Sequence, residues 1–70
     1  MPPAPSQERY VIPNLRNACR ILKLLGRSPD GLKGAEIGRA LAIPVTTTLR
    51  IMTTLHLEGL VRKNGAHYEL

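Results

Sequence analysis

The sequence predicts a mainly α-helical domain in which three helices precede a small β-hairpin. Apolar residues recur with helical spacing over residues 15–25 and again over residues 37–55. Between these regions lies Ser28-Pro29-Asp30-Gly31, a strong turn signal. Near the end of the chain, Asn64-Gly65 separates two short runs of extended character, the pattern of a hairpin. Seventy residues are enough for one such domain with a modest core.

Residues 1–12 are predicted to form a flexible arm in front of the folded domain at 13–70. The arm is rich in proline and has too few apolar groups to pack by itself. Its start has no apolar stretch of the kind found in secretory signals. No apolar run in the chain approaches the ~20 residues that span a bilayer. We therefore expect a soluble, cytoplasmic protein.

The first helix is predicted to be capped by Asn14 and to end near Gly26. Its apolar stripe consists of Leu15, Ala18, Ile21, Leu22 and Leu25. The basic residues of this helix fall on the opposite face, with no acidic residue between positions 14 and 27: Arg16, Arg20, Lys23 and Arg27. A solvated face explains them most simply, and phosphate contact is the alternative. The single cysteine, Cys19, is expected in the core or at its edge.

The second helix is predicted at about 35–41 and the third at about 44–58, joined by a turn at Ala42-Ile43. Pro44 suits the first position of the third helix, and Gly59 its end. Gly38 would allow a close approach between helices. The third helix has two distinct sides. One side, expected to be buried, carries Thr48, Ile51, Met52 and Leu55, and the other carries Thr46, Arg50 and Thr53.

Ten Lys and Arg residues against five Asp and Glu give a net charge of +5, which favours a polyanionic partner. Only two aromatic residues are present, which argues against stacking on single-stranded bases. No serine or cysteine lies near both a histidine and a carboxylate in sequence. His56 and His67 are too far apart in sequence to suggest a zinc site. We therefore predict no enzymatic activity, no cofactor and no metal site.

Two helices joined by a tight turn are typical of a helix-turn-helix, whose second helix enters the major groove of DNA. The residues predicted to contact bases lie in the first half of the helix at about 44–58: Val45, Thr46, Thr47, Leu49 and Arg50. Arginine can bind guanine O6 and N7 or a phosphate, threonine offers a hydroxyl, and apolar groups can contact the thymine methyl. The simpler explanation of these residues is that the threonines are ordinary surface residues without a binding role and that Val45 packs at the edge of the core.

The hairpin at 60–70 would then be a wing that lies on the DNA backbone or in the minor groove. Arg62 and Lys63 lead into its predicted tip at Asn64-Gly65. Lys33, in the extended link before the second helix, and Arg16 complete the predicted DNA contacts. Alternatively, the charges of the hairpin only protect an edge strand from aggregation.

The sequence contains an ordered set of motifs: Pro13-x-Leu15, Ala18, Ile21-Leu22-x-Leu24-Leu25, Gly31-Leu32, Glu36-Ile37, Ala40-Leu41-x-Ile43-Pro44, Thr46-Thr47, Arg50-Ile51-Met52-x-Thr54-Leu55, Gly59-Leu60-Val61 and Gly65-x-x-Tyr68-x-Leu70. The similarity that they define covers about residues 10–70. This set resembles the N-terminal winged helix-turn-helix domain of IclR-type regulators; MarR-like regulators are a related alternative. Ala42 stands where such turns usually have glycine, so a strained or altered turn is expected.

The resemblance implies a cytoplasmic transcription regulator that binds an operator in double-stranded DNA as a homodimer or a dimer of dimers. It also implies a C-terminal domain beyond Leu70 that binds a small-molecule effector. A winged helix used for protein–protein contact is the first alternative, because fold does not determine function. A basic amphipathic segment for membranes is the second, and the absence of interfacial aromatic residues from the first helix argues against it.

Overall fold

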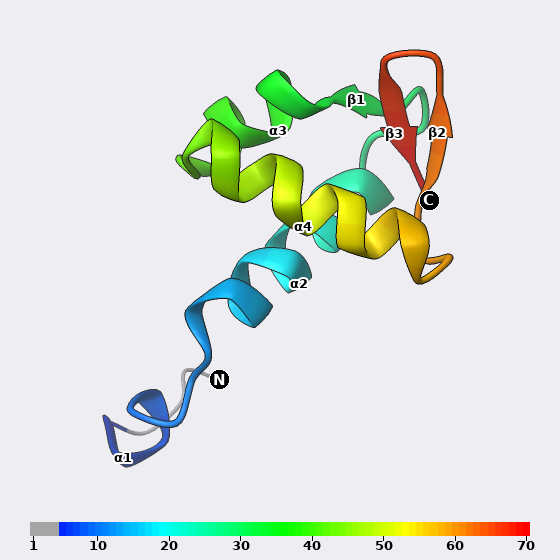
Figure 1. Ribbon diagram of the computed structural model, residues 1–70. Helices are drawn as coiled ribbons and strands as arrows, with labels where there is room; N and C mark the ends of the chain where they lie inside the picture. Colours follow the sequence, from blue (N-terminus) through cyan, green and yellow to red (C-terminus); the bar gives the residue numbers. More distant parts are fainter. Residues whose placement is uncertain (1–4) are drawn as a thin grey trace.

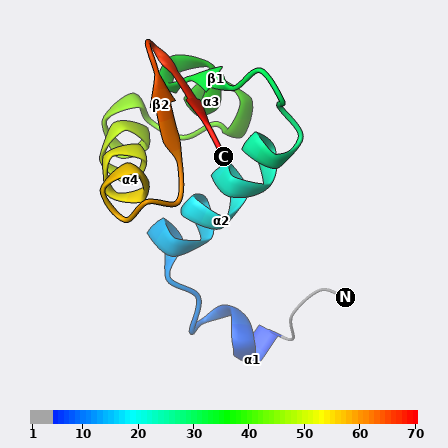
Figure 2. The ribbon, with the colours of Figure 1, turned by 90° about the vertical axis from the view of Figure 1, so that its right-hand side faces the viewer.

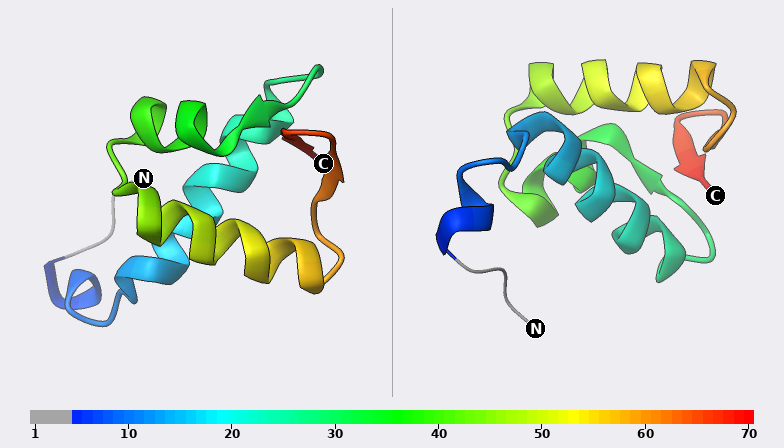
Figure 3. Two further views of the ribbon diagram at one scale, coloured as in Figure 1. Left: turned by 45° about the horizontal axis from the view of Figure 1, so that its top comes forward. Right: turned by 90° about the horizontal axis from the view of Figure 1, so that it is seen from below.

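The computed structural model describes residues 5–70 and has the predicted architecture (Figure 1). Its elements are α1 (Pro5–Glu8), α2 (Pro13–Gly26), β1 (Leu32–Lys33), α3 (Gly34–Leu41), α4 (Val45–Leu57), β2 (Arg62–Asn64) and β3 (His67–Glu69). Helices α2, α3 and α4 pack together, with the small sheet at one end of this bundle. Seen from below in Figure 3, α4 forms one layer over α2 and α3. The mainly helical fold class is confirmed.

Residues 5–12, the described part of the predicted arm, extend away from the three-helix body (Figures 1 and 2). Residues 5–8 form the single turn of α1, followed by a turn in which the Tyr10 N–H donates to the carbonyl of Gln7 at 3.0 Å. Residues 1–4 lie outside the described residues. The flexibility of residues 1–12 therefore stays a prediction.

Helix α2 begins at Pro13, and Ile12 rather than Asn14 is its N-cap, so the predicted cap was wrong. Pro13 has the φ angle that the first helical position requires, and the Arg16 N–H donates to the Ile12 carbonyl at 2.9 Å. The apolar stripe is buried only in the later turns of α2. Leu15 remains 58% exposed, because the first turn of α2 leads out of the body toward α1.

Cys19 is exposed, which contradicts its predicted place in or beside the core. It lies one position after Ala18, and at 100° per residue this turns its side chain out of the apolar stripe. The core itself draws on all three main helices and on the sheet. Its buried apolar residues are Ile21, Leu25, Ile37, Ile43, Ile51, Met52, Leu55, Val61 and Tyr68. The predicted buried side of α4 is confirmed, and it includes Thr48.

The turn between α3 and α4 ends α3 in a Schellman motif. The Ile43 N–H donates to the Gly38 carbonyl at 2.9 Å, and the Ala42 N–H donates to the Arg39 carbonyl at 3.4 Å. Ala42 lies in the left-handed region, with φ 55° and ψ 44°, where glycine is usual. Pro44 is the N-cap of α4, not its first helical residue as predicted.

Gly38 lets this turn close tightly. A Cβ atom at Gly38 would lie 3.0 Å from the Ile43 carbonyl oxygen and 3.1 Å from the Thr48 hydroxyl. The Thr48 hydroxyl is buried and donates to the Pro44 carbonyl at 3.0 Å. The close approach expected at Gly38 is therefore confirmed, and it brings the start of α4 against α3.

The sheet has three antiparallel strands in the order β1-β3-β2, one more than the predicted hairpin. The extra strand is the predicted extended link, which pairs Leu32 with Tyr68 and Lys33 with His67. The hairpin turn also differs by one residue from the prediction. Asn64 pairs with His67, so Gly65 and Ala66 form the two-residue loop. Gly65 has φ 62° at the first loop position, where a type II′ turn favours glycine.

We predict that Ala42→Gly stabilises the domain by about 1 kcal/mol, because glycine occupies positive φ without a clash of its side chain. Chemical denaturation would measure the change in the free energy of unfolding. Ala40→Gly is the matched control, because Ala40 is exposed within α3 and glycine should destabilise a helix interior by about 1 kcal/mol. Destabilisation by both substitutions would contradict the assignment of positive φ at Ala42.

Candidate nucleic-acid interface

The outward face of α4 is held in place by its buried side and displays most of the predicted DNA contacts. Val45 is 62% exposed and Leu49 is 47% exposed. Thr46 and Arg50 are also exposed, whereas Thr47 is half-buried. Thr53, which was not among the predicted contacts, extends the same exposed face. The helical wheel placed it there, but its position late in the helix gave no reason to choose it.

The hydroxyl groups on α4 fall into two classes. Thr48 and Thr54 donate to carbonyls one turn earlier, those of Pro44 and Arg50 respectively. Among the side chains that the structure describes, those of residues 7–70, the hydroxyls of Thr46, Thr47 and Thr53 make no hydrogen bond, so these groups are available to a ligand. Arg50 likewise has no ion pair within these residues. The face therefore combines free donors, one free guanidinium group and exposed apolar surface.

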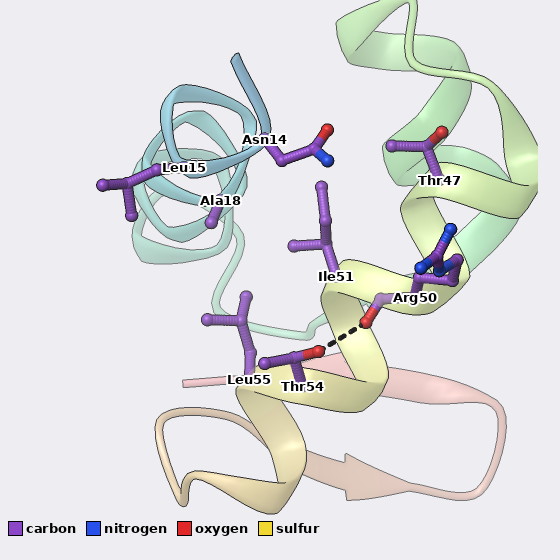
Figure 4. A pocket seen from close by; sticks show the side chains of 8 residues that line it. All are labelled: Asn14, Leu15, Ala18, Thr47, Arg50, Ile51, Thr54 and Leu55. Carbon is purple, nitrogen blue, oxygen red and sulfur yellow. Dashed lines mark hydrogen bonds between the residues drawn. The ribbon is translucent and has the colours of Figure 1, made fainter. Parts of the chain in front are cut away.

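A groove of about 330 Å³ runs between α2 and α4 (Figure 4). Its lining consists of Asn14, Leu15, Ala18, Thr47, Arg50, Ile51, Thr54 and Leu55. Asn14 points from α2 toward α4 and brings an amide to the side where Thr47 lies. Asn14 was not among the predicted site residues, because the only signal it gives in the sequence is that of a helix cap. Arg50 also borders a second, more open hollow with Leu49, Thr53 and Thr54.

Two arginines of α2 have partners that the sequence did not predict. Arg16 forms an ion pair with Glu8, which comes from α1 and not from the same helix. Arg20 donates to the Asn17 side chain at 3.1 Å and to the Leu41 carbonyl at 2.8 Å. The expectation of a basic face without acidic partners is therefore wrong for Arg16, whereas Arg20 has no carboxylate partner among the described residues. Arg20 instead joins α2 to the C-terminal end of α3, where a positive charge is favourable.

Strand register places the predicted cations of the wing on different faces. Arg62 lies opposite Glu69, with 3.5 Å between Arg62 Nη2 and Glu69 Oε1. Lys63 lies opposite Tyr68, and its Nζ is 5.6 Å from the centre of the Tyr68 ring, a cation–π contact. Because successive side chains in a strand alternate between faces, Arg62 and Lys63 point in opposite directions.

Lys33 pairs with His67 across β1 and β3, and its side chain is exposed. Its backbone N–H donates to Glu36 Oε1 at 2.9 Å and so joins the strand to the start of α3. By register, Lys33 shares the outer face of the sheet with His67 and Arg62. His67 is half-buried.

The predicted residues lie mostly on α4 and on the sheet, and Arg16 lies apart from them on α2. In Figure 2, α4 and the tip of the hairpin lie on the same side of the domain, away from α2. Arg16 lies near the start of α2, at the end of the molecule opposite the sheet (Figure 1). Within residues 5–70, no three His, Cys, Asp or Glu side chains gather as metal ligands. No helix of the described part is both long enough and apolar enough to cross a membrane.

A helix-turn-helix followed by an antiparallel hairpin defines the winged helix-turn-helix class of domains. Comparison with known families shows that the chain belongs to the IclR helix-turn-helix domain family, whose model matches residues 15–65. The predicted resemblance is confirmed.

The chain is also similar to the HTH-type transcriptional regulator Rv1719 of Mycobacterium tuberculosis, with 38% identity over 52 residues. The matched region is 74% of this chain and 20% of that protein, so the chain spans about a fifth of the relative's length. No solved structure matches the chain.

We predict that the pKa of Glu8 lies below its ordinary value because its carboxylate accepts a hydrogen bond from Arg16. An NMR titration of the Glu8 carboxyl group would measure it. Arg16→Ala should raise this pKa to the usual range, whereas Arg9→Ala, a neighbouring change of equal charge, should leave it unaltered. The ion pair forms above the lowered pKa and is lost as the pH falls through it. An equal response to both substitutions would contradict a specific Glu8–Arg16 pair.

Proposed function

We propose that this domain binds double-stranded DNA at specific sequences as part of a transcription regulator, with α4 in the major groove. The observation that carries the proposal is the exposed face of α4, whose free hydroxyls and free Arg50 guanidinium group are displayed by a helix packed firmly through its other side. An α-helix fits the major groove of B-DNA. Membership of the IclR helix-turn-helix family, a relative that is a transcriptional regulator and the net charge of +5 all support this function.

Within this proposal, Arg50 contacts a guanine through two hydrogen bonds, because it is exposed near the middle of the outward face. Thr46 and Thr47 supply hydroxyls to bases or to nearby phosphates. Val45 and Leu49 lie beside them and offer only apolar contact. Specificity then depends mainly on one charged residue, and the remaining contacts select by shape and by hydrogen bonding.

The backbone contacts come from residues outside α4: Arg16, Lys33, Arg62 and Lys63. Three of these residues have an internal partner in the free domain, namely Glu8 for Arg16, Glu69 for Arg62 and Tyr68 for Lys63. Exposed ion pairs contribute only about 0–1 kcal/mol. A DNA phosphate can therefore replace these partners at small energetic cost.

The wider assignments rest on the family and on the length of the relative. We propose that the complete regulator acts in the cytoplasm as a homodimer or a dimer of dimers. A C-terminal domain would bind its small-molecule effector. The family is one of helix-turn-helix domains, and we assign this chain no catalytic activity, cofactor or membrane role. A winged helix devoted to protein–protein contact is the competing function, and the two differ in their response to salt.

Affinity for DNA should fall on the order of 10²-fold between 50 and 200 mM salt if the four cations outside α4 contact phosphates. The estimate follows from a slope of about −0.9 for each phosphate in a plot of log affinity against log salt concentration. Fluorescence anisotropy with a labelled duplex would measure it. A flat salt response would favour the protein-interaction alternative.

Substitutions should separate base recognition from backbone contact. Arg50→Ala should weaken binding to the preferred site by about 1–3 kcal/mol and relax the preference at one base pair. Arg62→Ala and Lys63→Ala should weaken binding to all sequences alike, and each should reduce the salt slope by about one unit. Titrations of preferred and random duplexes would measure both effects. If Arg50→Ala weakened binding to both duplexes equally, Arg50 would be a phosphate contact.

A further inference from the structure

The first half of α4 carries two exposed apolar side chains where a DNA-reading helix would be expected to carry polar ones. Val45 is 62% exposed and Leu49 is 47% exposed. They are four residues apart, so they lie on the same side of the helix, one turn from each other. This half of the helix is the part that enters the groove in a helix-turn-helix.

Both side chains are held in restricted positions. A Cβ atom at Gly34 would lie 3.5 Å from Leu49 Cδ2, so Leu49 lies close to the backbone at the start of α3 while about half of it remains exposed. Val45 is β-branched, and one χ1 rotamer dominates for valine in a helix. The pair therefore forms a rigid apolar surface that loses little conformational entropy when it is covered.

The chemistry of the major groove offers one apolar group to such a surface. Base edges there carry hydrogen-bond donors and acceptors, except for the C5-methyl group of thymine. 5-Methylcytosine carries the same group at the same ring position. Neither Val45 nor Leu49 can form a hydrogen bond with a donor or an acceptor. Covering the polar edge of an unmethylated cytosine with either side chain would therefore cost free energy.

We infer that Val45 and Leu49 recognise the C5-methyl groups of pyrimidines in the DNA site. This inference rests on the proposed DNA binding and adds the class of base that the apolar pair selects. Each contacted methyl group should strengthen binding about fourfold, the equivalent of about 0.8 kcal/mol for one buried carbon. Two contacts in one half-site should strengthen it on the order of 15-fold.

Deoxyuridine in place of thymine tests the inference, because it removes only the methyl group and leaves every hydrogen-bonding group unchanged. The preferred duplex would be selected from a random library with the 70-residue chain, and each thymine replaced in turn. Anisotropy titrations at one salt concentration should show a fourfold loss of affinity at one or two positions. A second duplex would carry cytosine in place of such a thymine. If the site also binds the methyl group of 5-methylcytosine, methylation of that cytosine should raise the affinity about fourfold. No recovery would restrict the site to thymine.

Variants assign the effect to the two residues. Val45→Ala and Leu49→Ala should each remove the preference for thymine over deoxyuridine at one position, so that the ratio of the two affinities falls from about four to about one. Leu57→Ala is the matched control, because Leu57 is 77% exposed at the far end of the same helix and should keep the preference. Thermal unfolding of each variant would verify that the fold is retained.

The outcomes separate this inference from the proposed function. Equal binding of thymine and deoxyuridine at every position, with sequence preference retained, would overturn methyl recognition and leave DNA binding intact. A preference for thymine that survives Val45→Ala and Leu49→Ala would overturn the assignment to these residues. Absence of binding to any duplex would overturn the proposed function itself.

Discussion

The backbone hydrogen bond from the Ile43 N–H to the Gly38 carbonyl is the constraint on which the outward face of α4 depends. It requires positive φ at Ala42 and the absence of a side chain at Gly38. The buried Thr48 hydroxyl closes the same turn by donating to Pro44. Because the turn has no freedom at these points, the direction of α4 is set at its first residue. Every exposed side chain on α4 takes its position from that direction.

The positive charge of the domain is kept outside the face that would read bases. On α4 only Arg50 is cationic at neutral pH when the histidine is neutral, whereas cations surround it on α2, on β1 and in the wing. Arg16 and Arg62 have carboxylate partners and are themselves exposed, and surface ion pairs contribute little. Arg20 differs, because it holds α2 to the end of α3 through the Leu41 carbonyl. Positive charge therefore also serves the geometry of the helix pair.

The third strand gives the wing its rigidity. An isolated two-stranded hairpin is at best marginally stable in water. Here β1 pairs with β3, and Tyr68 from β3 is buried in the core beside Val61. Pairing across β3 also connects the wing to α3, since Lys33 is both a member of β1 and the N-cap of that helix. The wing and α4 thus belong to one packed unit.

The sequence by itself determined the three main helices, the buried side of α4 and the existence of a wing, because these follow from local periodicity and from glycine at Gly59 and Gly65. It also indicated the family and predicted five candidate contacts in the first half of α4. Only the tertiary structure decided the third strand, the hairpin register, the exposure of Cys19 and Leu15, and the pairing of Arg16 with Glu8. Apart from Cys19, these features depend on segments distant in the chain or on a choice between adjacent registers. The alternative arrangements of these features differ in free energy through their packing and their pairing partners. No local pattern of residues encodes these partners.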